Sequence, residues 1–236
     1  MALNEISPCF PSALFPLEDS TLWSGINRLQ STCLGMILLD IEVLFPLEEY
    51  FLTPREAARA LRMGPRRQKG FTAARVALKR LSRQLGLVDE NRLDRRIETL
   101  GPDNVRPCLA QSNLFCSVSH AGRFVVAVAH RHPIGVDLEA VSNKVLRAWH
   151  LFMSPREQEV ISLSCLDPLR TATRAWTTKE AAAKALGLHL FQAIREIEIV
   201  TVGDEEGMIR YRERTYPVRY SERGGHVLTL VTCGGP

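Results

Sequence analysis

The chain has 236 residues, and 45% of them are hydrophobic, which suits either one large globular domain or two of modest size. Its 30 Lys and Arg against 26 Asp and Glu leave a net charge of +4, too small to indicate a nucleic-acid-binding protein but compatible with an anionic ligand or an acidic partner. No stretch approaches the roughly 20 apolar residues of a membrane span, and the N-terminus lacks the pattern of a signal peptide, so we expect a cytoplasmic protein. Six scattered cysteines without a Cys-x-x-Cys pair predict neither a zinc site nor a disulfide framework.

The first half of the chain predicts a strand followed by helices. Residues 33 to 44 form an apolar run with strand composition. Thr53-Pro54 has the pattern of an N-cap followed by proline at the first helical position. Residues 62 to 85 place apolar side chains at helical spacing, which predicts an amphipathic helix with Arg66 and Arg67 at its entry. Such a charge run is often only a solvated surface, but these arginines stand near the helix N-terminus, where an anion binds favourably.

The second half predicts a hairpin, a further strand, helices and a final group of strands. Residues 87 to 113 are polar and rich in turn residues, so we interpret them as the loop that joins two halves. Beyond this loop, 114 to 120 and 124 to 130 predict a hairpin that leads into a strand at 134 to 139. The remaining pattern predicts helices from about residue 144, from Ser154 and over 176 to 187, and strands at 194 to 202, 207 to 214 and 226 to 232.

The two halves repeat one another in sequence. The segment from Phe51 to Glu56 resembles that from Phe152 to Glu157, and the helix from Phe71 aligns with the helix from Trp176. Internal similarity of this kind predicts a duplicated architecture, a pseudo-dimer within one chain.

In the same alignment, Asp40 and Glu42 of the first half match a pair of strand acids in the second. Arg75 stands where the second half has Glu180. A site that needs the helix acid is therefore expected once, in the second half.

Three acids and a lysine form the candidate site. Asp137 and Glu139 lie two residues apart on a predicted strand and so point to the same side. Glu180 and Lys184 lie one turn apart on a predicted helix. Strand carboxylates facing a helix carboxylate, with a cation one turn further on, would bind a hard divalent metal and a phosphate ester. Each pair alone has an ordinary explanation, a surface ion pair or a chance strand sequence, but their occurrence together behind a Ser-x-Ser-His strand favours a site.

These motifs resemble those of the 4'-phosphopantetheinyl transferase superfamily, in the two-half type associated with surfactin and enterobactin synthetases. The matching segments are Ser117-Val-Ser119-His120, Gly135-Val-Asp137-Leu-Glu139 and Trp176-Thr-Thr-Lys179-Glu180-Ala-Ala-Ala-Lys184, in the family's order and spacing. Arg66-Arg67 with Phe71 to Arg75 is similar to the basic first-half motif, although Ala74 replaces a frequent glycine, and Arg106-Pro107 stands where the family often has Lys-Pro or Arg-Pro. The resemblance covers residues 50 to 232.

The resemblance implies an enzyme, a holo-[carrier-protein] synthase. Such enzymes transfer the 4'-phosphopantetheine moiety of coenzyme A to a serine hydroxyl of an apo acyl, peptidyl or aryl carrier protein and release 3',5'-ADP. The implied fold is α/β (α+β), with two pseudo-two-fold-related halves that each have a small antiparallel sheet and packed helices. Residues 1–110 would contact the phosphates of coenzyme A, and residues 111–236 would hold the metal site and the catalytic helix. A monomer acting in nonribosomal peptide, polyketide or siderophore biosynthesis is expected.

The resemblance also implies a role for each motif residue. Asp137, Glu139 and Glu180 would hold Mg²⁺, with Mn²⁺ as an alternative. Either Glu180 or a metal-bound water would take the proton of the serine, and Lys184 would neutralise or protonate the leaving phosphate. The contacts to coenzyme A would come from Arg66, Arg67, Arg106, Ser119, His120, Lys179 and Lys184.

Two other functions compete with the transferase. The first is a coenzyme-A-binding regulatory pseudo-enzyme of the same fold, against which the intact set of three acids argues. The second is a nucleic-acid-binding protein that uses the basic helix at residues 66 to 83. That helix has few aromatic residues and no known nucleic-acid-binding motif, so we expect no nucleic-acid partner.

Overall fold

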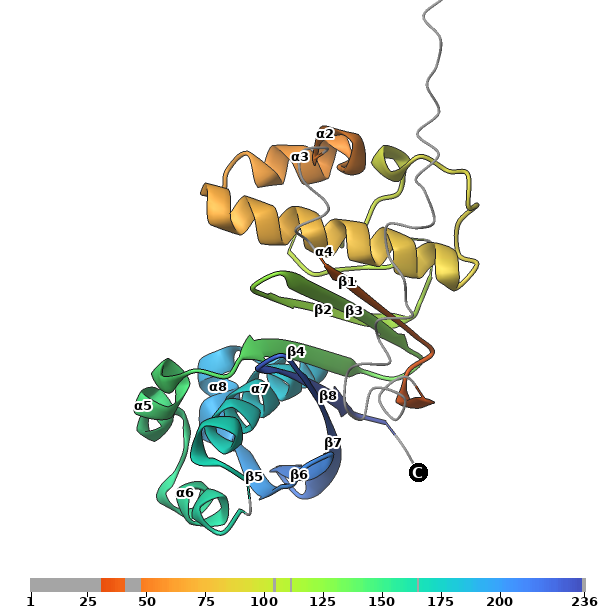
Figure 1. The fold of residues 1–236 in the computed structure, drawn as a ribbon. Coiled ribbons are helices and arrows are strands. Elements are labelled where there is room, and N and C mark those ends of the chain that lie inside the picture. Colours follow the sequence, from red (N-terminus) through yellow and green to blue (C-terminus); the bar gives the residue numbers. More distant parts are fainter. Residues whose placement is uncertain (1–30, 41–47, 104, 111, 165, 235–236) are drawn as a thin grey trace, which may run out of the picture.

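The computed structural model describes residues 31–40, 48–103, 105–110, 112–164 and 166–234. Two antiparallel sheets face each other in the middle of the molecule, and helices cover their outer faces (Figure 1). Helix α4 (Pro65–Gln84) lies on the first sheet, and helix α7 (Pro168–Leu186) lies on the second. A third apolar cluster fills the space between the sheets. The expected fold, two halves that each have a small antiparallel sheet and packed helices, is confirmed.

The first sheet contains strands from distant parts of the chain. Strands β1 (Gly35–Asp40), β2 (Phe115–Ala121) and β3 (Phe124–His130) pair in the order β1-β3-β2. The central strand β3 is apolar on both faces because α4 covers one side and the second sheet covers the other. The division between the sheets therefore falls after His130, further along the chain than the expected boundary between residues 110 and 111.

The second sheet has the order β4-β8-β7-β6-β5, and all of its neighbouring strands are antiparallel. Its strands are β4 (Ile134–Ala140), β5 (Ile197–Val202), β6 (Glu206–Tyr211), β7 (Arg214–Arg223) and β8 (His226–Thr232). Strand β7 is not among the predicted elements because its first half is mostly exposed and contains Pro217, which obscures the alternating pattern. It lies in the interior of the sheet, between β8 and β6.

The predicted helices are present, one of them is longer than expected, and three further short helical elements were not predicted. Helix α7 begins at Pro168 rather than Trp176, because Asp167 caps it by accepting hydrogen bonds from two backbone N–H groups. It ends, as predicted, at Gly187 in the left-handed conformation. The other predicted helices are α3 (Pro54–Ala60), α5 (Asn143–Phe152) and α6 (Pro155–Ser162). The unpredicted elements are α2 (Glu48–Phe51), a 3₁₀ turn (Asp94–Arg96) and α8 (Leu190–Glu196). In the described ranges, no helix has the length and apolarity needed to cross a membrane.

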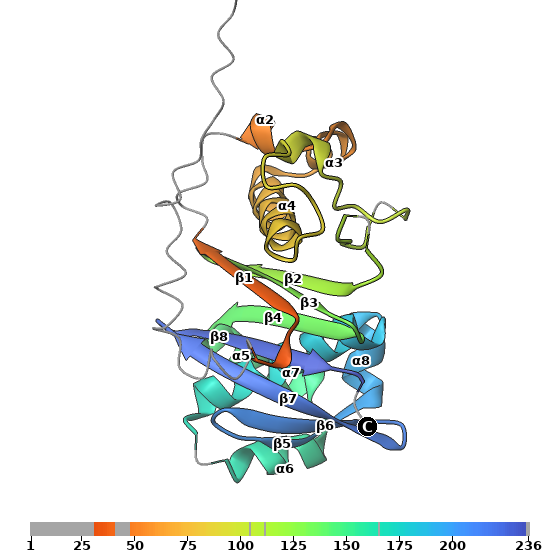
Figure 2. The same ribbon diagram turned by 90° about the vertical axis from the view of Figure 1, so that its right-hand side faces the viewer.

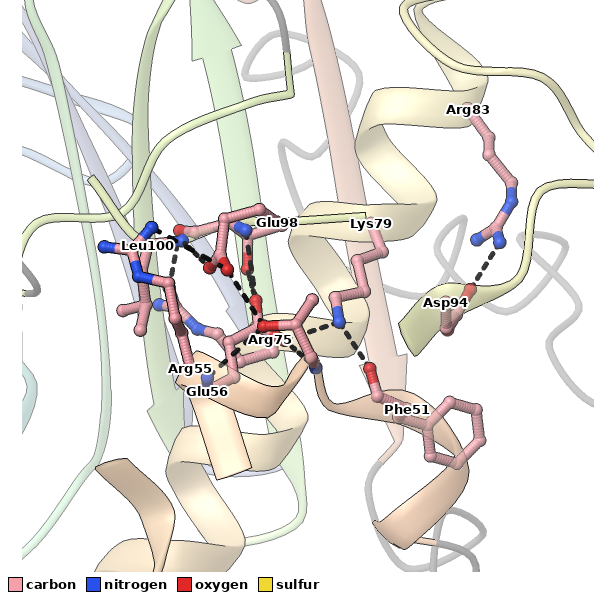
Figure 3. A network of polar contacts seen from close by, with 11 residues as sticks. Phe51, Arg55, Glu56, Arg75, Lys79, Arg83, Asp94, Glu98 and Leu100 are labelled. Atoms are coloured by element: carbon pink, nitrogen blue, oxygen red, sulfur yellow. Dashed lines mark hydrogen bonds and ion pairs between the residues drawn. The ribbon is translucent and has the colours of Figure 1, made fainter. Parts of the chain in front are cut away.

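A buried ion pair joins the two main helices of the first half (Figure 3). Thr53 and Glu56 form a capping box at the start of α3, as the Thr-Pro pattern predicts. The ammonium of Lys79 on α4 lies 2.6 Å from Glu56, and both side chains are 0% exposed. The other oxygen of Glu56 accepts the backbone N–H of Thr99 at 3.0 Å. Glu56 thus accepts hydrogen bonds from the start of a helix, from a buried lysine and from a loop.

The second half repeats this arrangement. Ser154 and Glu157 form the capping box of α6, Lys179 of α7 lies 2.6 Å from Glu157, and Glu157 accepts the N–H of Ile199 at 2.8 Å. Lys179 therefore corresponds to Lys79, and the duplication inferred from the sequence has a physical counterpart in these two pairs.

Two glycines fix the register between the halves. A Cβ at Gly35 of β1 would contact Leu81 and Leu85 of α4, and a Cβ at Gly135 of β4 would contact Ala181 and Ala185 of α7. In each case the second-half residue carries a number 100 higher than its first-half equivalent.

This register corrects the sequence alignment of the halves. Asp137 corresponds to Ile37 rather than Asp40, and Ile37 is part of the core beneath α4. Glu180 corresponds to Arg80 rather than Arg75. Glu42 lies outside the described residues. The strand acids Asp137 and Glu139 thus stand where the first half has the core residues Ile37 and Leu39, and the helix acid stands where it has an arginine, which again leaves one candidate site.

Candidate active site

The candidate site forms where α7 lies on β4. Gly135 has no side chain, and a Cβ at this position would stand 1.9 Å from the carbonyl oxygen of Ala181. The close approach brings Glu180 near Asp137, so that the charge of Asp137 acts on the carboxyl group of Glu180. Burial, followed by the charge of Asp137, raises the pKa of Glu180 to about 7, while Lys184 acts in the opposite direction.

Lys184 pairs with the strand acid. Its ammonium lies 2.8 Å from Oδ1 of Asp137 and 2.9 Å from the carbonyl oxygen of Val136. Asp137 is buried, whereas the side chain of Lys184 is 33% exposed. The lysine thus reaches from a buried carboxylate to the surface, where it can meet an anion.

Glu139 lies at the edge of the acid group. It follows Asp137 by two residues on β4, and its carboxylate accepts the backbone N–H of Ala140 at 3.1 Å. Burial raises the pKa of Glu139, and the charge of Asp137 raises it further. The two acids are therefore in electrostatic contact.

The acid group can be tested against the expected Mg²⁺. Within the described part of the chain, no three His, Cys, Asp or Glu side chains are already grouped as metal ligands. Mg²⁺ usually takes one or two carboxylates and completes its shell with water and substrate phosphates. Asp137 and Glu180 supply such a pair of hard oxygen donors, and the raised pKa of Glu180 beside Asp137 indicates negative charge that a cation would compensate. The residues present fit the ion.

Ser119, an expected coenzyme A contact, instead faces the acids. Its hydroxyl donates to Oδ1 of Asp137 at 2.8 Å and accepts the backbone N–H of Leu138 at 3.2 Å. Ser117, two residues earlier, accepts the N–H of Val136 at 3.0 Å. Both serines are buried. The two serines of the Ser-x-Ser motif therefore join strand β2 of the first sheet to strand β4 of the second.

His120 lies beside these groups on the exposed side of β2. Its ring rests against Gly70 of α4, where a Cβ would stand 2.3 Å from Nε2. Loss of water around the ring lowers the pKa of His120, and the nearby charges of Lys184 and Arg66 lower it further, against the influence of Asp137. Cationic groups from both halves thus converge at His120.

The other expected coenzyme A contacts do not join this group. Arg67 is exposed on the first turn of α4. Arg106 is 78% exposed and pairs with Asp103 at 3.6 Å, in the turn next to the bridge between Leu100 and Pro107. Lys179 is fully buried against Glu157, so the expected contact of Lys179 with coenzyme A does not follow from its position.

Sequence reasoning missed Gly70 and the structural use of Ser117. Gly70 carries a signal that could have identified it, because a glycine in the interior of a helical pattern usually has a packing or functional reason. Ser117 had no such signal, because the sequence pattern of a strand does not decide whether a serine side chain on it is exposed or buried.

Comparisons with known proteins agree with the motifs. The family model of the 4'-phosphopantetheinyl transferase superfamily matches residues 133–231, from just before β4 to the penultimate residue of β8. The chain is 25% identical over 121 residues to enterobactin synthase component D of Escherichia coli O157:H7 and of Shigella flexneri. It is 26% identical over 122 residues to the protein of that name from Escherichia coli K12.

Each of these matches covers 50% of the chain and spans 59% of the relative's length. The matched region contains the acid strand and the acid-and-lysine helix, which are the elements that meet in the candidate site. The resemblance expected from the motifs is therefore confirmed: residues 133–231 match the family model of the 4'-phosphopantetheinyl transferase superfamily.

Proposed function

We propose that the protein transfers the 4'-phosphopantetheine moiety of coenzyme A to a serine hydroxyl of an apo carrier protein and releases 3',5'-ADP in a Mg²⁺-dependent reaction. The observation that carries this proposal is the meeting of Asp137, Glu180 and Lys184 between β4 and α7. The match of residues 133–231 to the family model of the 4'-phosphopantetheinyl transferase superfamily supports the same reaction.

The cationic groups suit the phosphates of coenzyme A. Arg66 and Lys184 both act electrostatically on His120, so cationic side chains from the two halves lie within reach of this ring. Charge-assisted hydrogen bonds from such groups bind phosphate oxygens more strongly than neutral ones. A phosphate at this position would also favour the protonated form of His120, which the neighbouring cations disfavour in its absence.

The acids suit the metal and the proton transfer. Asp137 and Glu180, with Glu139 beside them, would hold Mg²⁺, which when bound neutralises phosphate charge and acts as a Lewis acid. Glu180 has a pKa of about 7, close to the value that favours a general base at neutral pH. The serine oxygen bonds to the phosphorus of the phosphopantetheine, the bond from that phosphorus to the 3',5'-ADP oxygen breaks, and Glu180 takes the hydroxyl proton. Lys184 faces the leaving phosphate.

The relatives narrow the class of partner. Enterobactin synthase component D is named for the synthesis of a siderophore. We propose that the carrier belongs to a nonribosomal peptide, polyketide or siderophore pathway, and that the protein acts as a cytoplasmic monomer.

A mass-shift assay tests the proposal. Purified protein, Mg²⁺ and coenzyme A should add the mass of phosphopantetheine to at least one member of a panel of apo acyl, peptidyl and aryl carrier proteins. The variant Glu180→Gln should still bind coenzyme A but transfer nothing. Binding of coenzyme A without any mass gain across the panel would instead identify a regulatory pseudo-enzyme and overturn the transferase proposal.

A further inference from the structure

We propose that Ser119 is a positioning residue that holds the carboxylate of Asp137 from the opposite half of the molecule. The inference rests on the proposed function, because it assigns to Ser119 a task in the metal site. It differs from the expectation drawn from the family resemblance, in which Ser119 contacts coenzyme A directly.

The position of Ser119 follows from how the two sheets meet. Strands β2 and β4 are each at the edge of their sheet, and edge strands leave backbone groups without a strand partner. Here the hydroxyl oxygens of Ser117 and Ser119 accept the N–H groups of Val136 and Leu138 at 3.0 and 3.2 Å. The serine side chains thus take the place of a neighbouring strand for β4.

The two serines differ in what their hydroxyl hydrogens do. The oxygen of Ser119 already accepts the N–H of Leu138, and its hydrogen is donated to Oδ1 of Asp137 at 2.8 Å. Ser117 contacts the backbone of β4 but, within the described ranges, donates to no carboxylate. Ser117 therefore only joins β2 to β4, whereas Ser119 joins the two strands and also binds the carboxylate of Asp137.

The hydrogen bond restricts the carboxylate of Asp137. Its Oδ1 receives the hydroxyl of Ser119 from β2 and the ammonium of Lys184 from α7, each at 2.8 Å. Two donors from different elements limit rotation of the Asp137 carboxylate. The carboxylate is therefore already oriented before a cation binds. Partners that orient a metal ligand in this way typically change metal affinity 10- to 100-fold when removed, on the order of 1.4 to 2.7 kcal/mol.

The hydrogen bond between Ser119 and Asp137 also links the acid to His120, the proposed phosphate-binding side chain. Ser119 is followed by His120 on β2, so one short segment fixes the carboxylate on one face and presents the imidazole on the other. Ser119 itself is only 9% exposed and both of its hydrogen-bonding functions are used, which leaves it poorly suited to direct contact with coenzyme A.

The variants Ser119→Ala and Ser117→Ala provide a matched test. Each leaves one buried N–H of β4 without its acceptor, so both should lower the melting temperature, and Ser119→Ala should lower it more because it also loses the bond to Asp137. Mn²⁺ binding, measured by the electron paramagnetic resonance signal of the free ion without carrier or coenzyme A, should weaken about 10-fold or more in Ser119→Ala. Ser117→Ala should stay within about twofold of the unmodified protein, and Ser119→Thr, which keeps a hydroxyl, should recover most of the affinity.

Transfer kinetics give a second readout. Ser119→Ala should lower kcat at a fixed Mg²⁺ concentration while KM for coenzyme A stays within about twofold, and excess Mg²⁺ should restore part of the rate. Unchanged Mn²⁺ affinity in Ser119→Ala, or a rise in KM for coenzyme A alone, would overturn the positioning role. If the unmodified protein binds Mn²⁺ but modifies no carrier, the proposed function fails, while the Mn²⁺ comparison of the two serine variants still decides the role of Ser119.

Discussion

The carboxyl groups of Asp137 and Glu180 lie close together where α7 packs on β4, and the charge of Asp137 adds to burial in raising the pKa of Glu180. Neighbouring carboxylates repel each other, so Glu180 keeps its proton to a higher pH than an isolated glutamate does. Without a metal, the proton on Glu180 neutralises part of the negative charge that a bound cation would otherwise neutralise. The pKa of Glu180 is accordingly raised to about 7.

The first prediction concerns stability and pH. Glu180 binds its proton more tightly in the folded protein than in the unfolded chain, where its ordinary pKa is 4.5. The resulting stabilisation is complete below that ordinary value and is lost as the pH rises through about 7. In the presence of a chelator, the melting temperature should fall between about pH 5 and pH 8, and Glu180→Gln should flatten this slope. A slope that is the same in both proteins would contradict the assignment.

The second prediction separates the two motif lysines. Lys179 is buried against Glu157, so Lys179→Met should lower the free energy of unfolding by about 3 to 5 kcal/mol, because Glu157 is left without its cation. Denaturant unfolding measures this loss. For the protein that remains folded, KM for coenzyme A should be unchanged.

A double variant controls for the buried charge. Lys179→Met combined with Glu157→Leu removes both charges and should regain part of the lost stability. A large rise in KM for coenzyme A in the single variant at temperatures where it is folded would instead support direct contact.

The sequence predicted the fold, and it led to acids and a lysine that the structure places close together, because both depend on local patterns. The capping boxes at Thr53 and Ser154 could be read directly, and the matching Pro-Arg-Glu segments revealed the duplication. Gly135 and the alternating acids of β4 likewise stand in one short segment.

The alignment of the long helices failed for a physical reason. It matched the aromatic residues Phe71 and Trp176, which are only partly buried, whereas the register is fixed by the glycine contacts and by the buried lysines. Whether a lysine lies inside the protein or at its surface depends on a partner far away in sequence, as Lys179 and Glu157 illustrate. The roles of Ser119 and Gly70 also depend on other elements, so local patterns could not reveal them.

The third prediction concerns Gly70. Replacing this helix-interior glycine by alanine should favour α4 by up to about 1 kcal/mol, because glycine is a poor helix former. The new Cβ would stand 2.3 Å from Nε2 of His120, and the imidazole, at the end of a flexible side chain, would have to move. Gly70→Ala should therefore keep or raise the melting temperature while the Kd for coenzyme A rises about tenfold, the equivalent of one charge-assisted hydrogen bond.

Two controls accompany this variant. A Cβ at Gly64, at the N-cap of the same helix, meets nothing within 4 Å, so Gly64→Ala should leave the Kd unchanged. Adding His120→Ala to Gly70→Ala should cause little further loss if both act through the same ring. An unaltered Kd in Gly70→Ala would show that the ring position does not matter for coenzyme A.

The last prediction uses the duplication as its own control. Gly135 and Gly35 occupy equivalent places, but a Cβ at Gly135 would stand 1.9 Å from the backbone oxygen of Ala181, whereas a Cβ at Gly35 would approach side-chain atoms of Leu85 and Leu81 at 2.9 and 3.0 Å. Side chains can adjust, and a helix backbone cannot without moving the whole helix. Gly35→Ala should therefore cost about 1 to 2 kcal/mol of unfolding free energy, and Gly135→Ala more than about 3 kcal/mol.

The same two variants separate effects on metal binding from effects on packing. Movement of α7 away from β4 would separate Glu180 and Lys184 from Asp137, so Gly135→Ala should also lose Mn²⁺ affinity at temperatures where it is folded. Gly35→Ala alters only the packing of α4 on β1 and should bind Mn²⁺ within about twofold of the unmodified protein. Denaturant unfolding and Mn²⁺ titration of both variants measure the two effects. Equal losses in the two halves would mean that the close approach at Gly135 serves packing alone.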